Sequence, residues 1–279
     1  MRLNKYLASC GICSRRDADK LIESGAVLVD GLPAQMGMLV DGSEEIYCNG
    51  KRVTGQEKKV VLLYNKPAGV TCTEKDSHAE RTIATEVDYP IRVTYAGRLD
   101  KESKGLLLLT NDGDLIEEMM RGANGHEKEY AVRVNKPIAA SDLKKLSDGI
   151  YLEDLDVTTK PCRTRKTGEN TFRIILTQGL NRQIRRMCEA VGYRVVHLIR
   201  VRVVNLELGD LEEGKYREAT PEEVAKLWEA LRVKDPKEQK EKKNKNDNGP
   251  KGSAGRASKA GKRKGEGRAW KQKETEKRK

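Results

Sequence analysis

One carboxylate in this sequence stands where a charge is costly. Asp100 lies in the stretch 96–113, which reads AGRLDKESKGLLLLTNDG, and a run of four leucines begins six residues after it. Such an apolar run predicts a buried strand, and a carboxylate beside a buried strand needs a cation, because an unpaired buried charge is costly. Asp100 is therefore a candidate chemical group, a carboxylate kept ionised and oriented by a partner. The structural alternative is an aspartate that caps a turn.

Three arginines that suit this carboxylate fall within the segment 181–191, which predicts a helix capped by Asn181. At 100° per residue they share one face of the helix, and apolar residues take the opposite face. The basic face carries Arg182, Arg185 and Arg186, and the apolar face carries Ile184, Met187, Cys188 and Val191. Arginines crowded on one face repel each other unless they meet an anion, either RNA phosphate or an internal carboxylate such as Asp100. The alternative is a solvated basic face paired with nearby glutamates.

An aromatic side chain completes the set of residues that could do chemistry. The segment 127–135 alternates as a strand does, with Tyr130, Val132 and Val134 on one face. A tyrosine ring offers a flat face to a nucleic-acid base, worth roughly 1–3 kcal/mol for each stacked base. The alternative is a core tyrosine with a satisfied hydroxyl. These residues alone indicate an RNA-binding protein with a candidate Asp–Arg–Tyr pocket, and they do not specify a reaction.

Several common motifs are missing from the sequence. It contains neither GxGxxG nor GxxxxGK[ST], the glycine-rich patterns of nucleotide sites, and no HExxH. Cys10 and Cys13 form a lone CxxC, and without a second pair at suitable spacing they are interpreted as small packed residues. With only three histidines, metal-assisted hydrolysis is disfavoured. The motifs therefore indicate neither a nucleotide site nor metal-assisted hydrolysis.

The cellular location follows from the apolar content and the cysteines. No run of 18 or more apolar residues occurs, so no transmembrane helix is expected. The N-terminus has neither a long apolar core nor a secretory cleavage pattern. We expect a cytoplasmic protein whose six cysteines are reduced thiols.

Residues 1–60 predict a small α+β unit that carries basic residues. A short helix ends near Gly11, and Ser14 is a good N-cap for a second helix that stops just before Gly25. Asp30-Gly31, Asp41-Gly42 and Asn49-Gly50 are hairpin signals. The exposed side of the second helix carries Arg15, Arg16 and Lys20. These three residues fit either RNA contact or an ordinary solvated face.

Residues 61–231 predict a larger unit that positions the candidate site. Strand pairs are broken by single helices, which favours a mixed, mainly antiparallel sheet over a doubly wound parallel one. One helix is expected to have Asp114 as its N-cap, with Glu117 three residues later as in a capping box, and to end at Gly122. A terminal helix is expected from Pro221, a residue favoured at the first helical position. The fold class is therefore α+β.

The net positive charge of the chain comes from the C-terminal segment 232–279. This segment holds 19 Lys and Arg against 7 Asp and Glu, whereas residues 1–231 hold 36 of each kind. A segment so poor in aliphatic residues cannot bury enough apolar surface to fold, so a disordered basic tail is expected. Its expected use is non-specific attraction to phosphates, and the alternative is a merely solubilising tail.

Two parts of the chain resemble known families. The first 60 residues, opening MRLNKYLASCGICSRRDADKLIESGAVLVDG, are similar to the S4 domain, a small RNA-binding module. AGRLDKESKGLLLLTNDGDL resembles the signature of the pseudouridine synthases that follow an S4 domain. YNKPAGVTCT, HEKEYAVRV and TQGLNRQIRRMCEAVGYRVVHLIRVR resemble three further motifs of that family, in its order, across residues 1–231. The sequences of these motifs are most similar to those of family members that modify large-subunit ribosomal RNA.

This resemblance implies roles for individual residues. Asp100 would be the catalytic aspartate that opens the C1′–N1 glycosidic bond of a uridine, Tyr130 would stack on the base, and Arg185 would pair with Asp100. The pocket would be supported by Arg98, Leu99, Lys128 and Leu198. The RNA-binding residues would be Arg15, Arg16, Lys20, Lys66, Arg182 and Arg186.

The resemblance also implies the partners. RNA is the expected partner, in particular large-subunit ribosomal RNA or its precursor. The protein is expected to act as a monomer and not to bind a membrane. No metal or cofactor is implied, because the isomerisation involves neither net redox change nor hydrolysis. Two alternatives stay open: the same chemistry on another ribosomal RNA site or on tRNA, and a non-catalytic RNA-binding or ribosome-assembly factor.

Overall fold

The computed structural model describes residues 1–73, 80–121 and 125–232 of the chain. The predicted tail, 232–279, lies outside the described residues apart from Arg232, and so does Gly122, the predicted end of one helix. In the described part, no helix is both long and apolar enough to cross a bilayer.

The N-terminal unit has the predicted two helices and hairpins. Helices α1 (Leu3–Ser9) and α2 (Arg15–Glu23) pack on a four-stranded antiparallel sheet in the order β2-β1-β3-β4. Its strands are β1 (Val27–Val29), β2 (Leu32–Pro33), β3 (Ile46–Cys48) and β4 (Lys51–Arg52). The Ser14 hydroxyl accepts a hydrogen bond from the Asp17 amide at 3.2 Å and so caps α2, as predicted. Asp30 and Asn49 both have φ near +50°, as the first residue of an Asp-Gly or Asn-Gly hairpin turn requires.

The larger unit is built on a mixed sheet whose strands are mostly antiparallel, as predicted. Seven strands form its path in the order β11-β12-β8-β13-β7-β5-β15, and only β7 and β13 run parallel. The path strands are β5 (Val61–Lys66), β7 (Lys104–Thr110), β8 (Lys128–Val134), β11 (Arg163–Lys166), β12 (Thr171–Leu176), β13 (Val195–Val203) and β15 (Tyr216–Glu218). The shorter pieces are β6 (Thr94–Tyr95), β14 (Leu206–Glu207), and the separate pair β9 (Tyr151–Leu152) and β10 (Val157–Thr158).

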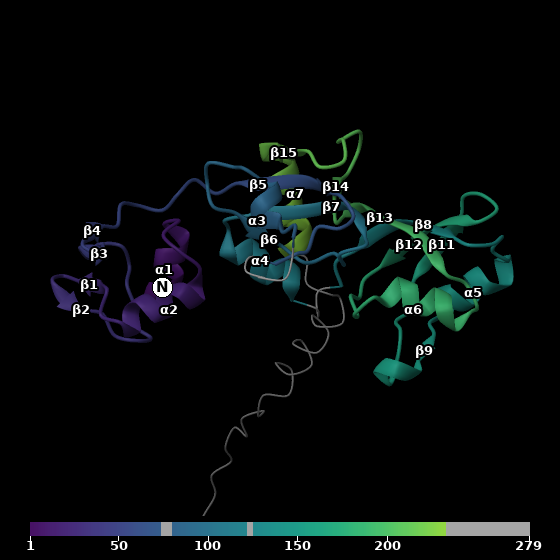
Figure 1. The fold of residues 1–279 in the computed structure, drawn as a ribbon, viewed down its shortest axis with the longest axis horizontal. Helices are drawn as coiled ribbons and strands as arrows, with labels where there is room; N and C mark the ends of the chain where they lie inside the picture. Colours follow the sequence, from purple (N-terminus) through teal and green to yellow (C-terminus); the bar gives the residue numbers. More distant parts are fainter. Residues whose placement is uncertain (74–79, 122–124, 233–279) are drawn as a thin grey trace, which may run out of the picture. The chain divides into compact units, whose positions relative to one another are not determined.

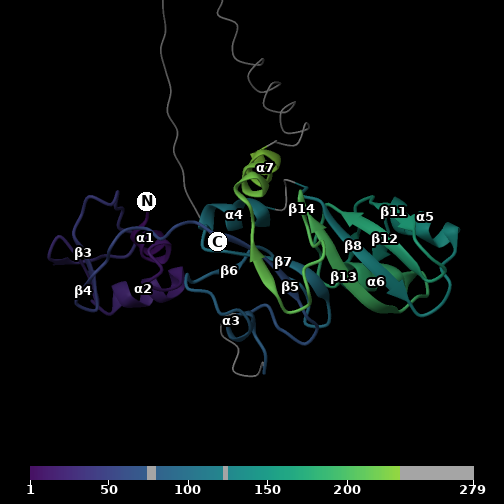
Figure 2. The same ribbon diagram turned by 90° about the horizontal axis from the view of Figure 1, so that it is seen from above.

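Helices cover different parts of this sheet (Figures 1 and 2). They are α3 (Ile83–Glu86), α4 (Gly113–Met120), α5 (Ala140–Asp148), α6 (Gln183–Ala190) and α7 (Pro221–Arg232), with a 3₁₀ turn at Glu153–Leu155. Helices α4 and α7 pack on the half that contains β5 and β7, and α5 and α6 pack on the half that contains β8 and β12. A third cluster, which includes Ile83 of α3, covers the other face of β5 and β7, so three hydrophobic cores pack on the sheet.

The leucine run forms β7, which is buried on both faces. Leu106 and Leu108 face α4 and α7, whereas Leu107 and Leu109 face α3. All four have no exposed surface. Alternate residues of a strand point to opposite faces, so a strand covered on both sides is apolar at every position. This explains why the run is continuous rather than alternating.

Two predicted helix starts are wrong by one or two residues. Helix α4 is capped by Asp112, whose side chain accepts a hydrogen bond from the Asp114 amide at 3.1 Å. Asp114 was predicted as the cap, but the helix begins two residues earlier, where Asp112 provides the capping carboxylate. Helix α6 begins at Gln183, and its N-cap is Arg182 in the left-handed conformation, with φ +50°. Asn181, the predicted cap, therefore lies outside the helix.

Candidate active site

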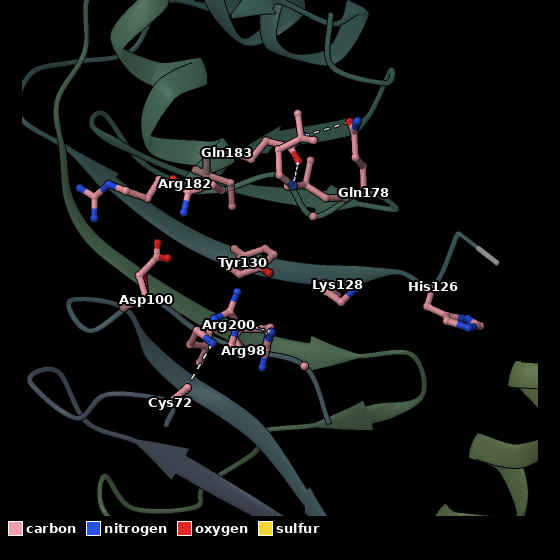
Figure 3. Close-up of a pocket in the computed structure, with 18 of the residues that line it drawn as sticks. Cys72, Arg98, Asp100, His126, Lys128, Tyr130, Gln178, Arg182, Gln183 and Arg200 are labelled. Atoms are coloured by element: carbon pink, nitrogen blue, oxygen red, sulfur yellow. Dashed lines mark hydrogen bonds between the residues drawn. The ribbon is translucent and has the colours of Figure 1, made fainter. Parts of the chain in front are cut away.

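A cavity of about 690 Å³ lies where the β6–β7 loop, β8, β13 and the segment before α6 meet (Figure 3). It collects seven of the thirteen predicted site residues: Arg98, Leu99, Asp100, Lys128, Tyr130, Arg182 and Leu198. These residues come from four distant stretches of the sequence. The structure therefore brings together most of the pocket that the sequence predicts.

Buried cations hold the loop that carries Asp100. Lys66, at the end of β5, donates hydrogen bonds to the carbonyls of Lys101 (3.3 Å) and Ser103 (2.9 Å). Arg200 donates from Nη1 to the carbonyl of Arg98 at 3.3 Å. Main-chain oxygens on both sides of Asp100 are thus anchored to the sheet, so the half-buried carboxylate is held at the cavity wall.

The prediction that Lys66 contacts RNA is wrong. Its side chain has no exposed surface, and its third hydrogen bond goes to the Pro67 carbonyl at 2.8 Å. Burial lowers the pKa of Lys66 to about 8. A lysine that is saturated by main-chain carbonyls supports the loop from behind and cannot reach a phosphate.

Tyr130 lies on the cavity side of β8. In register it stands between Ile174 of β12 and Arg200 of β13. Its ring is half-buried and packs against the core covered by α5 and α6 and against the core that contains α3. Leu198, which is 6% exposed, lies on β13 and adds an apolar wall to the same cavity. The arrangement suits a flat, uncharged ring such as a nucleic-acid base.

The predicted ion pair between Arg185 and Asp100 is not formed. The Arg185 Nε lies 3.9 Å from Oε2 of Glu102, and its Nη1 reaches the Val195 carbonyl at 3.4 Å. Arg182 also pairs with Glu102, at 3.0 Å, because its left-handed backbone carries it away from the helix and into the cavity lining. Asp100 and Glu102 are two residues apart in the sequence, and in the structure Arg182 and Arg185 contact Glu102.

This contact has an electrostatic consequence for Glu102. The hydrogen bond from Arg182, followed by the charge of the same residue, lowers the pKa of Glu102. Arg186, the third arginine, forms an ion pair with Asp154 and donates to the Asn181 carbonyl at 2.9 Å. All three arginines of this segment therefore have carboxylate partners within the protein.

The sequence did not predict Arg200, which lines the cavity, or Glu102, which pairs with Arg182 and Arg185. Arg200 is 2% exposed and donates from Nε to the Leu106 carbonyl at 2.7 Å. Its signal was present, because it shares a strand face with Leu198 and so had to point inward. Glu102 had no such signal, since its pairing depends on the left-handed turn at Arg182.

The basic residues expected to contact RNA in the N-terminal unit are exposed. Arg15, Arg16 and Lys20 lie on the solvent side of α2. The Lys20 Nζ is 3.8 Å from Asp17, a surface pair that stabilises little. Within the described ranges, no group of three or more His, Cys, Asp or Glu side chains is arranged to hold a metal ion.

Comparison with known proteins agrees with the geometry. The chain matches the family model of RNA pseudouridylate synthase over residues 60–190 and that of the S4 domain over residues 1–46. It is 42% identical to the dual-specificity RNA pseudouridine synthase RluF of Escherichia coli (strain K12), over 83% of this chain and 79% of the relative. It is 36% identical to the ribosomal large subunit pseudouridine synthase B of Bacillus subtilis (strain 168), over 81% of this chain and 95% of the relative.

A solved structure shows the same fold. The crystal structure of a pseudouridylate synthase superposes with a TM-score of 0.60 at 31% sequence identity, over 81% of this chain and 99% of that one. The predicted resemblance is thereby confirmed. The chain belongs to the RNA pseudouridine synthase family and carries an S4 domain at its N-terminus.

Proposed function

We propose that this protein isomerises a specific uridine to pseudouridine in large-subunit ribosomal RNA, acting as a monomer in the cytoplasm. One observation carries the proposal: Asp100 lines a cavity with an aromatic ring and an apolar wall, in a chain that belongs to this family. The large-subunit target is supported by the Bacillus relative, which is named ribosomal large subunit pseudouridine synthase B. Six free cysteines suit a reducing compartment.

The geometry suits the chemistry of the isomerisation. The C1′–N1 bond breaks, the C1′–C5 bond forms, C5 loses a proton and N1 gains one, so atoms and electrons balance without an oxidant or water. Asp100 supplies the carboxylate that opens the glycosidic bond, and Tyr130 with Leu198 holds the detached base while it turns. The uridine must first leave its stack to enter such a cavity, which single-stranded loops of RNA allow most readily.

A second RNA class is a specific alternative. The Escherichia coli relative is named a dual-specificity RNA pseudouridine synthase. A substrate test must therefore include tRNA as well as ribosomal RNA. Mapping of pseudouridine in total RNA, with and without the gene, identifies the target position directly.

The proposal is tested by replacing the carboxylate. Asp100→Asn should abolish tritium release from RNA labelled at C5 of uridine, while the RNA dissociation constant changes little. Asp148→Asn is the matched control, because Asp148 is an exposed residue paired with Lys144 on α5, outside the cavity. Activity near that of the wild type in Asp100→Asn, or no release by the wild type on any RNA, would overturn the proposal.

A further inference from the structure

A group of cations lines the cavity beyond Tyr130. Lys128 lies two residues before Tyr130 on β8, so both side chains point to the same face, about 7 Å apart along the strand. Figure 3 shows Arg98 and Arg200 beside the Tyr130 ring, with Asp100 on one side of it and Lys128 on the other. All four of these residues and Tyr130 line the same cavity.

These cations have no carboxylate partner among the residues that the structure describes. Arg200 donates only to main-chain carbonyls, those of Leu106 and Arg98. The Lys128 amine forms neither a hydrogen bond nor an ion pair with any described residue. Its neighbour His126 donates to the Glu118 carbonyl, and burial lowers the pKa of this histidine.

The carboxylates nearest in sequence are engaged elsewhere. Glu129 points to the opposite face of β8 and pairs with Arg202 at 3.2 Å. Glu127 also pairs with Arg202, at 3.0 Å. Half-buried cations are normally compensated, because burial removes the water that stabilises their charge. The cavity therefore keeps positive charge that the protein's own carboxylates do not neutralise.

We propose that Lys128 and Arg200 form an anion subsite that binds an anionic oxygen of the target nucleotide. This inference rests on the proposed function. Two oxygens have the required chemistry: one on the phosphate next to the flipped uridine, and a uracil carbonyl oxygen. The latter becomes negative when the C1′–N1 bond breaks with its electron pair left on the base, and it returns that pair when the C1′–C5 bond forms.

The energetics agree with a site that is completed by substrate. Burial, followed by the charge of Arg200, lowers the pKa of Lys128. An anion placed between the two cations would favour the charged amine again. Hydrogen bonds between charged groups contribute about 1.5–3 kcal/mol, which corresponds to roughly tenfold to a hundredfold in an equilibrium or rate constant. A purely structural lysine would instead have protein acceptors, as Lys66 has.

The experiment compares Lys128→Met and Lys128→Arg in the full chain. RNA affinity is measured by fluorescence anisotropy on the Asp100→Asn background, and the single-turnover rate by tritium release at saturating RNA. Lys128→Met should lose at least tenfold in affinity or in rate, and Lys128→Arg should recover most of that loss because it keeps the charge. Lys144→Met, on the exposed side of α5, is the control and should change neither.

A second arm identifies the oxygen. RNA with an uncharged methylphosphonate linkage beside the target uridine is tested against wild type and Lys128→Met. If the subsite holds the phosphate, the methylphosphonate weakens binding to wild type and leaves Lys128→Met unaffected. If it holds the uracil oxygen, both proteins respond equally to the methylphosphonate, and Lys128→Met loses rate with its affinity intact.

Either of two results would overturn the anion subsite. One is that Lys128→Met stays within twofold of wild type in both affinity and rate, and the other is that Lys128→Arg is as impaired as Lys128→Met. Thermal unfolding identifies a misfolded variant, in which case Lys128→Gln replaces it. The affinity arm requires no turnover, so a wild type that binds through Lys128 without forming pseudouridine would refute the proposed function and not this subsite.

Discussion

At the scale of single residues, the basic side chains at the cavity differ in how many hydrogen bonds they make within the protein. Lys66 and Arg200 both support the Asp100 loop through main-chain carbonyls. Lys128 has no such acceptor within the described residues, although it lines the same cavity. The sequence predicted Lys66 as an RNA contact, since a lysine in a motif cannot be distinguished from a buried one until its neighbours are known.

The burial of Lys66 predicts a pH-dependent stability. Its pKa is about 8 in the folded protein and near 10.5 in the unfolded chain, so between these values the unfolded state binds more protons. The free energy of unfolding of wild type, relative to Lys66→Met, should therefore rise with pH across this window, by up to about 1.4 kcal/mol per pH unit.

Urea unfolding of both proteins at pH 7.5, 8.5 and 9.5 measures this difference. Lys226→Met, on the exposed side of α7, corrects for the general effect of removing a lysine. A difference between wild type and Lys66→Met that stays constant over the three pH values would show that Lys66 keeps an ordinary pKa in the folded protein.

At the scale of elements, most of the architecture could be predicted, including the starts of α2 and α7, but the starts of α4 and α6 could not. The leucine run predicted a buried strand, and the alternation around Tyr130 predicted its face, because both depend on period and burial alone. The start of α6 depended on one left-handed residue, Arg182, which propensity does not reveal. The helix cap thereby moves by one position, from Asn181 to Arg182, and Arg182 and Arg185 meet Glu102 rather than Asp100.

The parallel contact between β7 and β13 should depend on one glycine. Gly105 has φ +101°, and a Cβ there would lie 2.3 Å from the Arg200 carbonyl oxygen and 2.7 Å from its amide nitrogen. Both neighbours are backbone and cannot move away easily. Gly105→Ala should therefore destabilise the protein by about 2–4 kcal/mol, through backbone strain and overpacking together.

Chemical unfolding compares Gly105→Ala with Gly113→Ala. Gly113 opens α4 with ordinary helical geometry, and a Cβ there would meet no heavy atom within 4 Å, so alanine should be neutral or slightly stabilising. Equal stability of the two variants would mean that β7 and β13 can separate without cost. A decrease of tritium release in Gly105→Ala beyond its decrease of stability would reflect the displaced Arg200.

At the scale of the whole molecule, the charge is divided between parts of the chain. Residues 1–231 carry equal numbers of acidic and basic groups, and the excess of positive charge lies in 232–279. Affinity for phosphates that is independent of sequence scales with the number of basic groups that contact them. We expect the pocket residues to select one nucleotide, and the tail and the basic face of α2 to supply general affinity.

Deletion of 233–279 tests this division of roles and leaves α7 complete. The deletion should weaken RNA binding at 150 mM salt. It should also flatten the dependence of log Kd on log salt, by about 0.7 for each phosphate of single-stranded RNA that the tail neutralises in the full chain. The single-turnover rate at saturating RNA should not change, because the deletion leaves the described cavity lining untouched. Arg15→Gln with Arg16→Gln in the same assay measures the share of α2. A salt dependence that is identical with and without 233–279 would show that the tail does not touch RNA, and its charge would then serve solubility alone.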